Sequence, residues 1–409
     1  MSSAQPILTR TAYYCTLGSA AAALFSIAVS QTLLALALAA LLMSGVKLRL
    51  PPVWIPAALF MAGTVASLAL SGDAAAGRPQ IRKFFVYLTL LVVFSVLREA
   101  VDVRRLMLAW AGVGGLSAVW GIAQFGQKFA QAARGGYSFY EHYVGERITG
   151  FMSHWMTFSG GLMIALIMLA AYLMFAPSAR GKWALLGWLC AGVLGLALLA
   201  GITRSAWLAS AVAAVYLVWR WKRRLLLALP LVAIVVLWLG PSWVRTRVIS
   251  GFEPRGQLDS NQHRLVCWRT GWRMIRAHPW FGVGPEMVQS KLMDYVPPDV
   301  RRPLPEGWYG HLHSIYIHYA AERGVPTMLM LVWLLGQALW DFLRALRRLP
   351  AEAGEERFIL HGAVAVVVAV AVAGAFELNL GDSEVLAMFL AVVSCGYVAV
   401  ERAFSATRP

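Results

Sequence analysis

Residues 151–175 read FMSHWMTFSGGLMIALIMLAAYLMF, and this stretch decides the class of fold. It contains no Lys, Arg, Asp or Glu. A helix of about 20 apolar residues crosses the hydrocarbon core of a bilayer, because each residue adds roughly 1.5 Å to its length. We therefore expect a helix that spans a membrane here, because a soluble domain has no use for so long an apolar run.

The same pattern recurs along the chain, which has 409 residues, 59% of them hydrophobic, and a mean hydropathy of +0.63. The predicted fold is therefore an all-α integral membrane protein with about twelve transmembrane helices. The predicted spans are residues 12–28, 30–46, 52–71, 83–98, 105–125, 151–175, 183–202, 204–220, 224–240, 312–343, 358–376 and 384–401. The stretch 312–343 is longer than a bilayer is thick, so we expect its first turns to protrude into water.

The distribution of Lys and Arg over the short loops predicts the orientation, because cytoplasmic loops carry an excess of these residues. Both termini are predicted to face the cytoplasm, with residues 126–150 and 241–311 on the other side. Among the short loops, only residues 72–83 oppose this orientation, since they carry Arg78, Arg82 and Lys83. The formal net charge of +16 includes many Arg residues on that outer side, and phosphate groups of a lipid or lipid-linked substrate would pair with them.

Two histidines stand where the polar stretch gives way to an apolar helix, in His311-Leu312-His313. Imidazole accepts and releases protons near neutral pH, and ionisable groups at a membrane boundary are costly to keep there. These residues are therefore candidates for acid–base chemistry. The plainer interpretation is that they cap or anchor the helix that follows.

Single arginines also stand at the mouths of apolar spans. Arg147 lies in Glu146-Arg147-Ile148-Thr149-Gly150-Phe151, and Arg204 lies between two hydroxyl residues in Thr203-Arg204-Ser205. A lone Arg in so short a loop resembles an anion site more than a solvated surface. Other basic residues are expected to contact lipid headgroups instead: Arg245, Arg247, Arg301 and Arg302. Arg82 and Lys83 are expected either to contact headgroups or to bind the phosphate of a lipid-linked substrate.

An amphipathic helix is predicted to begin at Arg264. It carries Trp and Ile on one stripe and Arg on another, and it ends at His278-Pro279, where His278 is expected to cap the helix. The two stripes are Trp268, Trp272 and Ile275, and Arg269, Arg273 and Arg276. Trp308 and Tyr309, next to the histidine pair, are candidates for stacking on a sugar face.

Taken in order, five segments resemble the bacterial O-antigen ligase/O-antigen polymerase superfamily. They are Arg147-x-x-Gly150, Thr203-Arg204-Ser205, Arg264-x-x-x-Trp268, His278-Pro-x-x-Gly-x-Gly284, and His311-x-His313 followed by Glu322-x-Gly324. The resemblance covers roughly residues 140–330 and the number of helices. Many members have Asn after the second His, where this chain has Ser314.

The family transfers glycans from an undecaprenyl-diphosphate carrier on the periplasmic face of the bacterial inner membrane. Its ligase branch moves O-antigen onto the lipid A–core, and its polymerase branch extends the glycan on the carrier. The resemblance implies that Arg147, Arg204 and Arg264 bind the diphosphate and that His313 acts on the acceptor hydroxyl. His311 either takes part directly or positions His313.

The chemistry of the residues agrees with this assignment. Breaking a sugar–diphosphate bond leaves negative charge on the phosphate, which must meet a cation. Many transferases use a metal held by an Asp-x-Asp pair, but the nearest sequence, Asp382-Ser383-Glu384, is expected to be a helix N-cap with an acidic first turn. We therefore expect the arginines to replace the metal and the protein to need neither metal nor cofactor. A single displacement with no protein nucleophile would invert the anomeric configuration.

The predicted domains are a transmembrane bundle in residues 1–240, a periplasmic helical loop in 241–311 and three further transmembrane helices in 312–409. The long late loop favours an O-antigen ligase that uses an undecaprenyl-diphosphate-linked donor, a lipid A–core acceptor and surrounding membrane lipids, with no nucleic acid. An O-antigen polymerase and a protein O-oligosaccharyltransferase remain alternatives. A flippase of lipid-linked oligosaccharide is disfavoured, because the candidate residues gather on one face and no half-chain repeat is evident.

Overall fold

The computed structural model describes residues 5–136, 138–251, 260–302, 304, 309–350 and 354–405. Within these residues the secondary structure is helical and includes no strand, which confirms the predicted all-α class. The first half of the bundle is formed by α1 (Gln5–Ala22), α2 (Ile27–Met43), α3 (Trp54–Leu70), α4 (Ala74–Arg82), α5 (Phe84–Val96), α6 (Ala100–Gly135), α7 (Phe139–Gly145), α8 (Trp155–Phe175), α9 (Gly181–Ala200) and α10 (Arg204–Lys222). The second half contains η1 (Arg223–Ala228), α11 (Leu229–Leu239), α12 (Ser242–Ile249), α13 (Ser260–Ala277), α14 (Val288–Tyr295), α15 (Ile315–Arg323), α16 (Val325–Arg348), α17 (Glu355–Gly374), η3 (Asn379–Gly381) and α18 (Ser383–Ser405).

Seven helical segments of the described chain are long and apolar enough to cross a membrane. They are α4 with α5, α6, α8, α9, α16, α17 and α18. Helices α2 and α3 are apolar but shorter. The chain is therefore a multi-pass membrane protein, and the expected total of about twelve spans remains a prediction.

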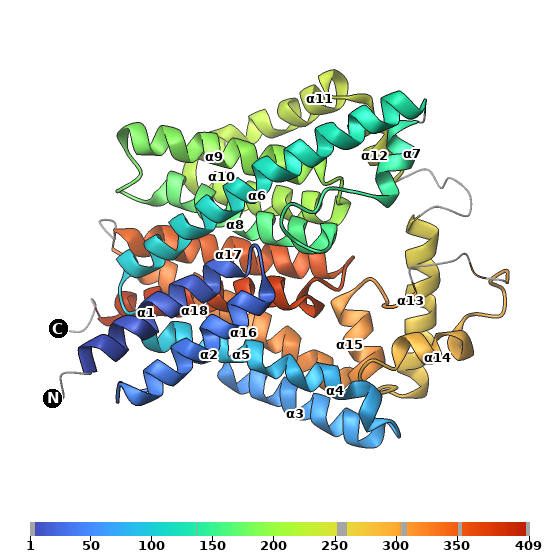
Figure 1. Ribbon diagram of the computed structural model, residues 1–409, viewed down its shortest axis with the longest axis horizontal. Helices are drawn as coiled ribbons and strands as arrows, with labels where there is room; N and C mark the ends of the chain where they lie inside the picture. The colour runs from blue at the N-terminus through green and yellow to red at the C-terminus, as the bar shows by residue number, and fades with distance from the viewer. Residues whose placement is uncertain are drawn as a thin grey trace.

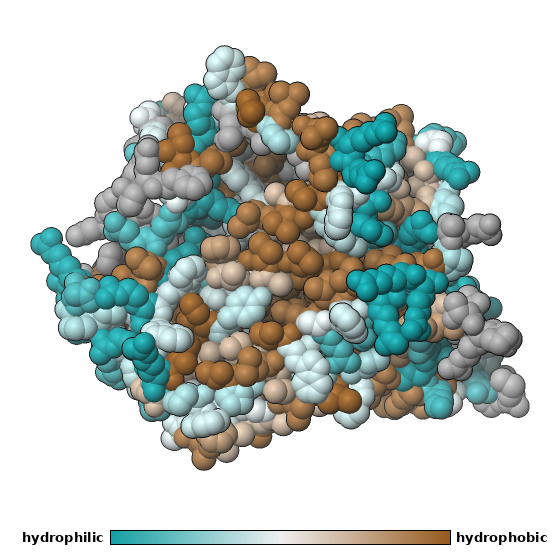
Figure 2. Space-filling model, turned by 180° about the vertical axis from the view of Figure 1, so that it is seen from behind, coloured by the Kyte–Doolittle hydropathy of each residue, from teal (hydrophilic) through white to brown (hydrophobic). Residues whose placement is uncertain are grey.

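Most of the long helices run along a similar direction, and one end of the molecule is formed mainly by shorter helices (Figure 1). Helices α12, α13 and α14 lie at that end together with α7 and α15, whereas α1 begins at the opposite end. Helices α8, α17 and α18 are largely buried inside the bundle. Figure 2 shows hydrophobic side chains over a broad middle band and hydrophilic ones mostly toward both ends, as a bilayer would require.

Several predicted boundaries are wrong. The first break was expected at Ser30-Gln31, but α1 ends at Ala22, and α2 begins after Ser26, whose hydroxyl accepts a hydrogen bond from the amide of Val29. A serine at this position satisfies a free amide of the first turn, so the chain turns there. Helix α6 also continues ten residues into the predicted 126–150 loop, since Gln, Lys and Ala favour a helix until Gly136 ends it with a φ of 66°.

The predicted helix 312–343 is two helices, α15 and α16, which meet at Gly324. Gly324 has a φ of 87°, and Pro326 in the first turn of α16 has no amide hydrogen to continue the α15 hydrogen-bond pattern. Helix α15 begins at Ile315 rather than at residue 312, because the Ser314 hydroxyl caps it by accepting from the Ile317 amide. The expected protruding first turns are thus a separate short helix.

The α15–α16 junction is crossed by the segment that follows α13. The amides of Val283 and Gly284 each donate to carbonyls of α15 over 2.9 Å, and the Val325 amide donates to the Pro279 carbonyl over 2.8 Å. A Cβ on Gly324 would lie 2.0 Å from the Trp280 carbonyl oxygen, so only glycine permits this crossing. The glycines of the His278-Pro-x-x-Gly-x-Gly284 and Glu322-x-Gly324 segments therefore join the outer helices to the bundle.

Helix α13 is already helical at Ser260, one turn before the predicted start at Arg264, and it ends at Ala277. The amide of His278 makes the last bond of the helix, to the Met274 carbonyl over 2.8 Å, as expected for a residue at its C-terminus. The ring of His278 lies 2.7 Å from the Tyr295 hydroxyl of α14. His278 therefore connects two of the outer helices.

Candidate active site

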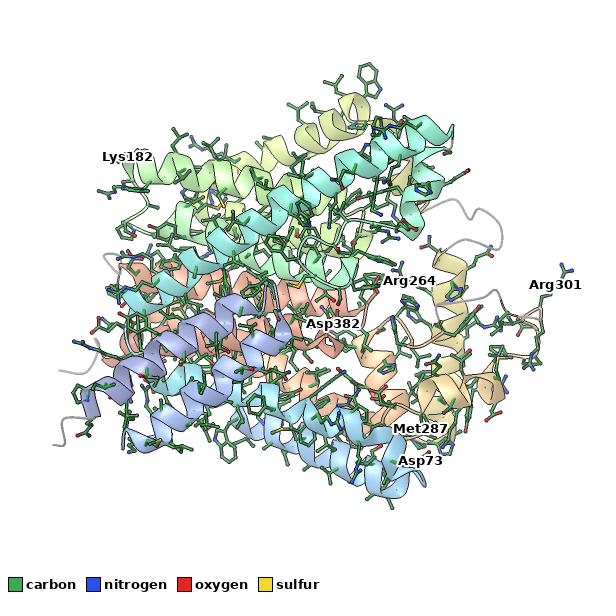
Figure 3. The ribbon with its side chains drawn as sticks, viewed as in Figure 1. Asp73, Lys182, Arg264, Met287, Arg301 and Asp382 are labelled. Carbon is green, nitrogen blue, oxygen red and sulfur yellow. The ribbon has the colours of Figure 1, made fainter. Side chains whose placement is uncertain are left out.

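A cavity of about 270 Å³ lies where the outer helices meet the bundle. Its walls come from the α4–α5 junction, the start of α8, the α9–α10 turn, the segment after α13, the histidine segment and the loop between α17 and α18. Side chains of opposite character line it, among them Lys83, His154, Thr203, Glu286, His311 and Glu377. Figure 3 shows Arg264 and Asp382 in this region, far from Lys182 at the other end of the bundle.

The carboxylate of Glu377 connects the arginine and histidine candidates. It is only 4% exposed, and it accepts a hydrogen bond from the guanidinium of Arg264. Its Oε2 atom lies 3.6 Å from Nδ1 of His313. Burial would raise the pKa of Glu377, but the contact with His313 and the charge of Arg264 outweigh it and hold the pKa below its ordinary value. Glu377 therefore remains a buried anion between the two residues.

Arg147 belongs to the same electrostatic cluster. It is 5% exposed, and its guanidinium lies over the Trp155 ring, 5.3 Å from the centroid. Burial is the main reason that its pKa is lowered, and the positive charge of Arg247 adds to this effect, while Glu377 opposes it. A nearby anion stabilises a buried cation such as the Arg147 guanidinium. The cluster therefore favours a negatively charged ligand.

Arg247 was expected to reach lipid headgroups, and this expectation is wrong. Its side chain is only 5% exposed, and its Nε donates to the Ile202 carbonyl over 2.9 Å. By contrast, Arg245 on the same helix is exposed, as are Arg301 and Arg302. Arg247 thus fixes the α9–α10 turn and adds positive charge next to Arg147.

Two buried hydrogen-bond donors near Glu377 and Arg147 have no partner in the described part of the chain. They are Nε of Arg264 and Nε1 of Trp155. Buried donors without partners are rare in native structures, because leaving one unpaired costs about 1–3 kcal/mol. Since both groups can only donate, the ligand that satisfies them must offer acceptor atoms, as phosphate oxygens do.

Arg204 is held slightly apart from this cluster. Its Nη2 donates to the side-chain oxygen of Asn261 over 2.7 Å, and Asn261 lies one turn before Arg264 in α13. Its neighbours Thr203 and Ser205 line the cavity. The structure thus brings Arg147 and Arg264 together around Glu377, and it places Arg204 between the α9–α10 turn and the start of α13.

The two histidines occupy different positions. His313 is 2% exposed and has a φ of 50°, which is strained for a residue with a Cβ, whereas His311 lines the cavity. Nδ1 of His311 accepts the backbone amide of His313 over 3.3 Å, so the neutral ring carries its proton on Nε2. Burial, reinforced by His313, lowers the pKa of His311 to about 3, which keeps that ring neutral.

The contact with Glu377 gives His313 the opposite tautomer. A carboxylate facing Nδ1 favours a proton on that nitrogen, and Nε2 is then the nitrogen that carries the lone pair. His313 is therefore suited to act as a base, and His311 is suited to donate a hydrogen bond from Nε2. The ring centroids of the two residues are 4.2 Å apart, so one substrate group can approach both.

Residues 189–332 match the family model described as O-antigen ligase. This match supports the predicted O-antigen ligase/polymerase superfamily for that part of the chain. No curated protein matches the sequence. Arg204, Arg264 and both histidines lie inside the matched range, whereas Arg147 and Glu377 lie outside it and complete the cluster from flanking segments.

Other predicted residues around the O-antigen ligase domain have mixed outcomes. Lys83 lines the cavity and donates to the Gly381 carbonyl over 2.9 Å, while Arg82 borders an apolar groove between α3 and α5. Asp382 precedes α18 as expected for an N-cap, but its side chain accepts from Thr157 over 2.8 Å. Trp308 lies outside the described residues, and the ring of Tyr309 lies against His263.

Sequence reasoning missed Glu377, Trp155 and Arg247. Glu377 ends an apolar span and is separated by 113 residues from Arg264, so no local motif contains both. One sequence signal could have found Glu377: it is a single acidic residue at the mouth of an apolar span, and keeping a charge there costs free energy, as it does for the two histidines. Trp155 resembled an ordinary interfacial aromatic residue, and only its unpaired indole nitrogen distinguishes it.

Proposed function

We propose that the protein is an O-antigen ligase that transfers a glycan from a polyprenyl-diphosphate carrier to a sugar of the lipid A–core. The reaction would take place at the periplasmic face of the bacterial inner membrane. The observation that carries this proposal is the buried cluster of Arg147, Arg264 and Glu377 next to His313. It combines an anion site with an oriented base beside one cavity.

The anion site would hold the diphosphate of the donor. Arg264 Nε and Trp155 Nε1 are buried donors that phosphate oxygens would satisfy, and Arg147 adds a charge close to them. These groups would bind the leaving diphosphate more tightly as negative charge develops on it, which lowers the barrier. Arg204, held by Asn261, would contact a more distant phosphate oxygen or the first sugar. Arginines thus perform the charge stabilisation that a divalent metal performs in many other transferases.

The acceptor hydroxyl would react in one displacement. Its oxygen forms a bond to the anomeric carbon while the bond from that carbon to the diphosphate oxygen breaks and the electron pair leaves with the carrier. The hydroxyl proton passes to Nε2 of His313, whose imidazolium is stabilised by Glu377. His311 Nε2 would donate a hydrogen bond to a substrate oxygen at the same place. One displacement inverts the configuration at the anomeric carbon.

Two related activities differ from this one only in the acceptor. An O-antigen polymerase would use a second carrier-linked glycan, and a protein O-oligosaccharyltransferase would use a Ser or Thr hydroxyl. The long polar segment that contains α12, α13 and α14 is the feature that favours the ligase among these activities. The ligase reaction is therefore the one to test first.

The test is a reconstituted transfer assay with purified protein, a polyprenyl-diphosphate-linked glycan and a lipid A–core acceptor. Transfer should proceed in EDTA, and Arg264→Ala should lose about 2–5 kcal/mol of transition-state stabilisation. Arg269→Ala is the matched control, because Arg269 lies on the same helix but is paired with Asp299 at the surface. Transfer only to carrier-linked glycan or only to peptide would refute the ligase assignment. Transfer restored by Mg²⁺ or Mn²⁺ after EDTA would refute metal independence.

The two histidines should separate in the same assay. His313→Ala should reduce turnover by about 10²–10⁴ while donor binding remains, since a general base contributes about this much. His311→Ala should lose less, because its ring supplies a hydrogen bond rather than accepting the proton. Near-normal transfer by correctly inserted His313→Ala would place the base elsewhere.

A further inference from the structure

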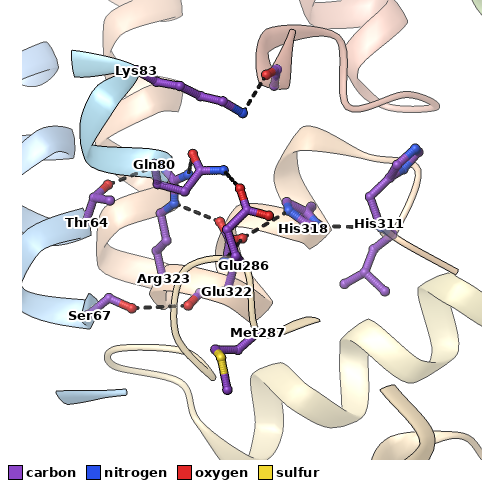
Figure 4. A network of polar contacts seen from close by, with 12 residues as sticks. Thr64, Ser67, Gln80, Lys83, Glu286, Met287, His311, His318, Glu322 and Arg323 are labelled. Atoms are coloured by element: carbon purple, nitrogen blue, oxygen red, sulfur yellow. Dashed lines mark hydrogen bonds and ion pairs between the residues drawn. The ribbon is translucent and has the colours of Figure 1, made fainter. Parts of the chain in front are cut away.

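One wall of the cavity is built around Glu286. This residue follows Gly284-Pro285, its side chain is exposed and lines the cavity, and its φ is 62°. Figure 4 shows its carboxylate in a space bordered by Lys83, His318 and His311. The Glu286 carboxylate has no place in the transfer chemistry described above.

A chain of buried side chains holds Glu286 in position. Arg323, only 3% exposed, donates to Oε1 of Gln80 over 2.7 Å. Because that oxygen accepts, the Gln80 amide nitrogen must point the other way, and it donates to Oε1 of Glu286. Glu322 closes the ring, since it accepts from the Glu286 amide over 2.8 Å and from Arg323 Nε over 2.9 Å.

The anchoring groups are themselves fixed and charged. Glu322 is 1% exposed; burial would raise its pKa, but Arg323 and His318 hold it at about 2. Thr64 of α3 accepts a further hydrogen bond from Arg323 over 3.1 Å. An exposed glutamate normally samples many rotamers, so this chain removes side-chain entropy before any ligand arrives. Such preorganisation is typical of a binding group rather than of a solvated surface residue.

The carboxylate on this wall favours sugar hydroxyls. A carboxylate repels the diphosphate that the Arg147–Arg264 side attracts, but it accepts charge-assisted hydrogen bonds from hydroxyl groups. Gln289, the second residue of α14, lines the same wall and offers an amide that can both donate and accept. Glu286 and Gln289 therefore give this part of the cavity groups that can bind hydroxyls, next to Lys83 and His318.

We propose that Glu286 binds hydroxyl groups of the acceptor sugar, with Gln80 as its positioning residue. This assignment rests on the proposed glycan transfer and adds the location of the second substrate. The ligand is a neutral sugar with free neighbouring hydroxyls, one of which points toward His311 and His313.

The experiment measures KM for donor and acceptor separately in the reconstituted transfer assay. Glu286→Gln should raise the acceptor KM about 10- to 100-fold, which corresponds to one hydrogen bond to a charged group, and should leave the donor KM unchanged. Glu286→Asp keeps the charge and should raise the acceptor KM less. Glu141→Gln is the matched control, because Glu141 is an exposed glutamate on α7 at the same end of the molecule, and it should leave both constants unchanged.

The outcomes separate this assignment from the proposed function. If Glu286→Gln leaves the acceptor KM unchanged while Arg264→Ala loses turnover, the acceptor site is wrong and the transferase function stands. If both glutamate variants raise the donor KM, Glu286 contacts the donor and the assignment is overturned. If the wild-type protein transfers no glycan to any acceptor, the function and the site fail together. A thermal unfolding midpoint equal to that of the wild type confirms that each variant is folded.

Discussion

Replacing Glu377 by Gln tests the central arrangement of the site most directly. The amide has the shape of the carboxylate but no charge, so His313 loses the group that favours a proton on Nδ1, and Arg264 loses its counter-ion. Loss of an orienting carboxylate behind a catalytic imidazole costs up to about 10⁴ in turnover, so a loss of about 10²–10⁴ is expected for Glu377→Gln.

The same substitution should also affect stability. The side chains of Arg264 and Glu377 are 15% and 6% exposed. Breaking a buried pair costs roughly 3–5 kcal/mol, and the partial exposure of Arg264 places the expected loss near the lower figure. Because the pKa of Glu377 is lowered in the folded protein, its contribution is present above the ordinary value of 4.5 and is lost as the pH falls through the folded value. The difference in unfolding midpoint should therefore be constant between about pH 5 and 8 and should shrink only in stronger acid.

The assay compares kcat and the thermal unfolding midpoint of the wild type and Glu377→Gln in detergent. Glu355→Gln is a matched control, since Glu355 also forms an ion pair with an arginine, Arg104 Nη1, over 2.9 Å, but on the first turns of α6 and α17. It should lose stability without losing the kcat of the folded fraction. A kcat for Glu377→Gln within threefold of the wild type would refute the role of Glu377 in orienting His313.

Three further predictions follow from other parts of the structure. Arg247→Ala should abolish most transfer, because it removes a buried charge and the hydrogen bond to the Ile202 carbonyl. Arg245→Ala, on the exposed side of α12, should leave transfer nearly unchanged. Equal activity of the two variants in the transfer assay would contradict a role for the buried Arg247 side chain. Gly324→Ala should lower the free energy of unfolding by more than about 2 kcal/mol, because its Cβ would meet the Trp280 carbonyl and its φ is 87°. Gly336→Ala in α16, where the space around the Cβ position is open, should not lower it. A Gly324→Ala protein as stable as the wild type would mean that the backbone at this crossing can shift. In a variant lacking the four native cysteines, Ser290→Cys should react with an impermeant maleimide in intact cells and Ser178→Cys only after lysis; the reverse pattern would invert the orientation and remove the periplasmic site.

The sequence predicts the membrane class and most helices, because apolar spans of this length have few other uses. Hydropathy does not mark where a helix bends inside an apolar or semi-polar run, and this is why the sequence predicts a single helix over residues 312–343. The bend depends on Gly324, and its need for glycine is a property of the neighbouring Trp280 backbone, which sequence spacing does not reveal.

The candidate site follows the same logic. Arg147, Arg264 and His313 could be selected because each breaks a local pattern at a membrane boundary, and the structure brings them together. Glu377 and the burial of Arg247 could not be derived, since both depend on which distant segments pack against each other. Sequence patterns identify charged groups whose burial costs free energy, and only the folded structure shows which of these charges pair with one another.

The late position of Glu377 has a consequence for how the protein is made. Arg147 and Arg264 are synthesised well before the turn that carries their counter-ion, which arrives only after α17 has followed them. Until that hairpin is inserted, Arg264 lacks its counter-ion and His313 lacks the carboxylate next to it, although the outer helices can already bond to α15 and α16. A chain truncated before residue 377 would therefore be expected to insert its early helices yet remain an open, protease-sensitive assembly. Completion of the last hairpin would then act as the step that both closes the structure and switches on its chemistry.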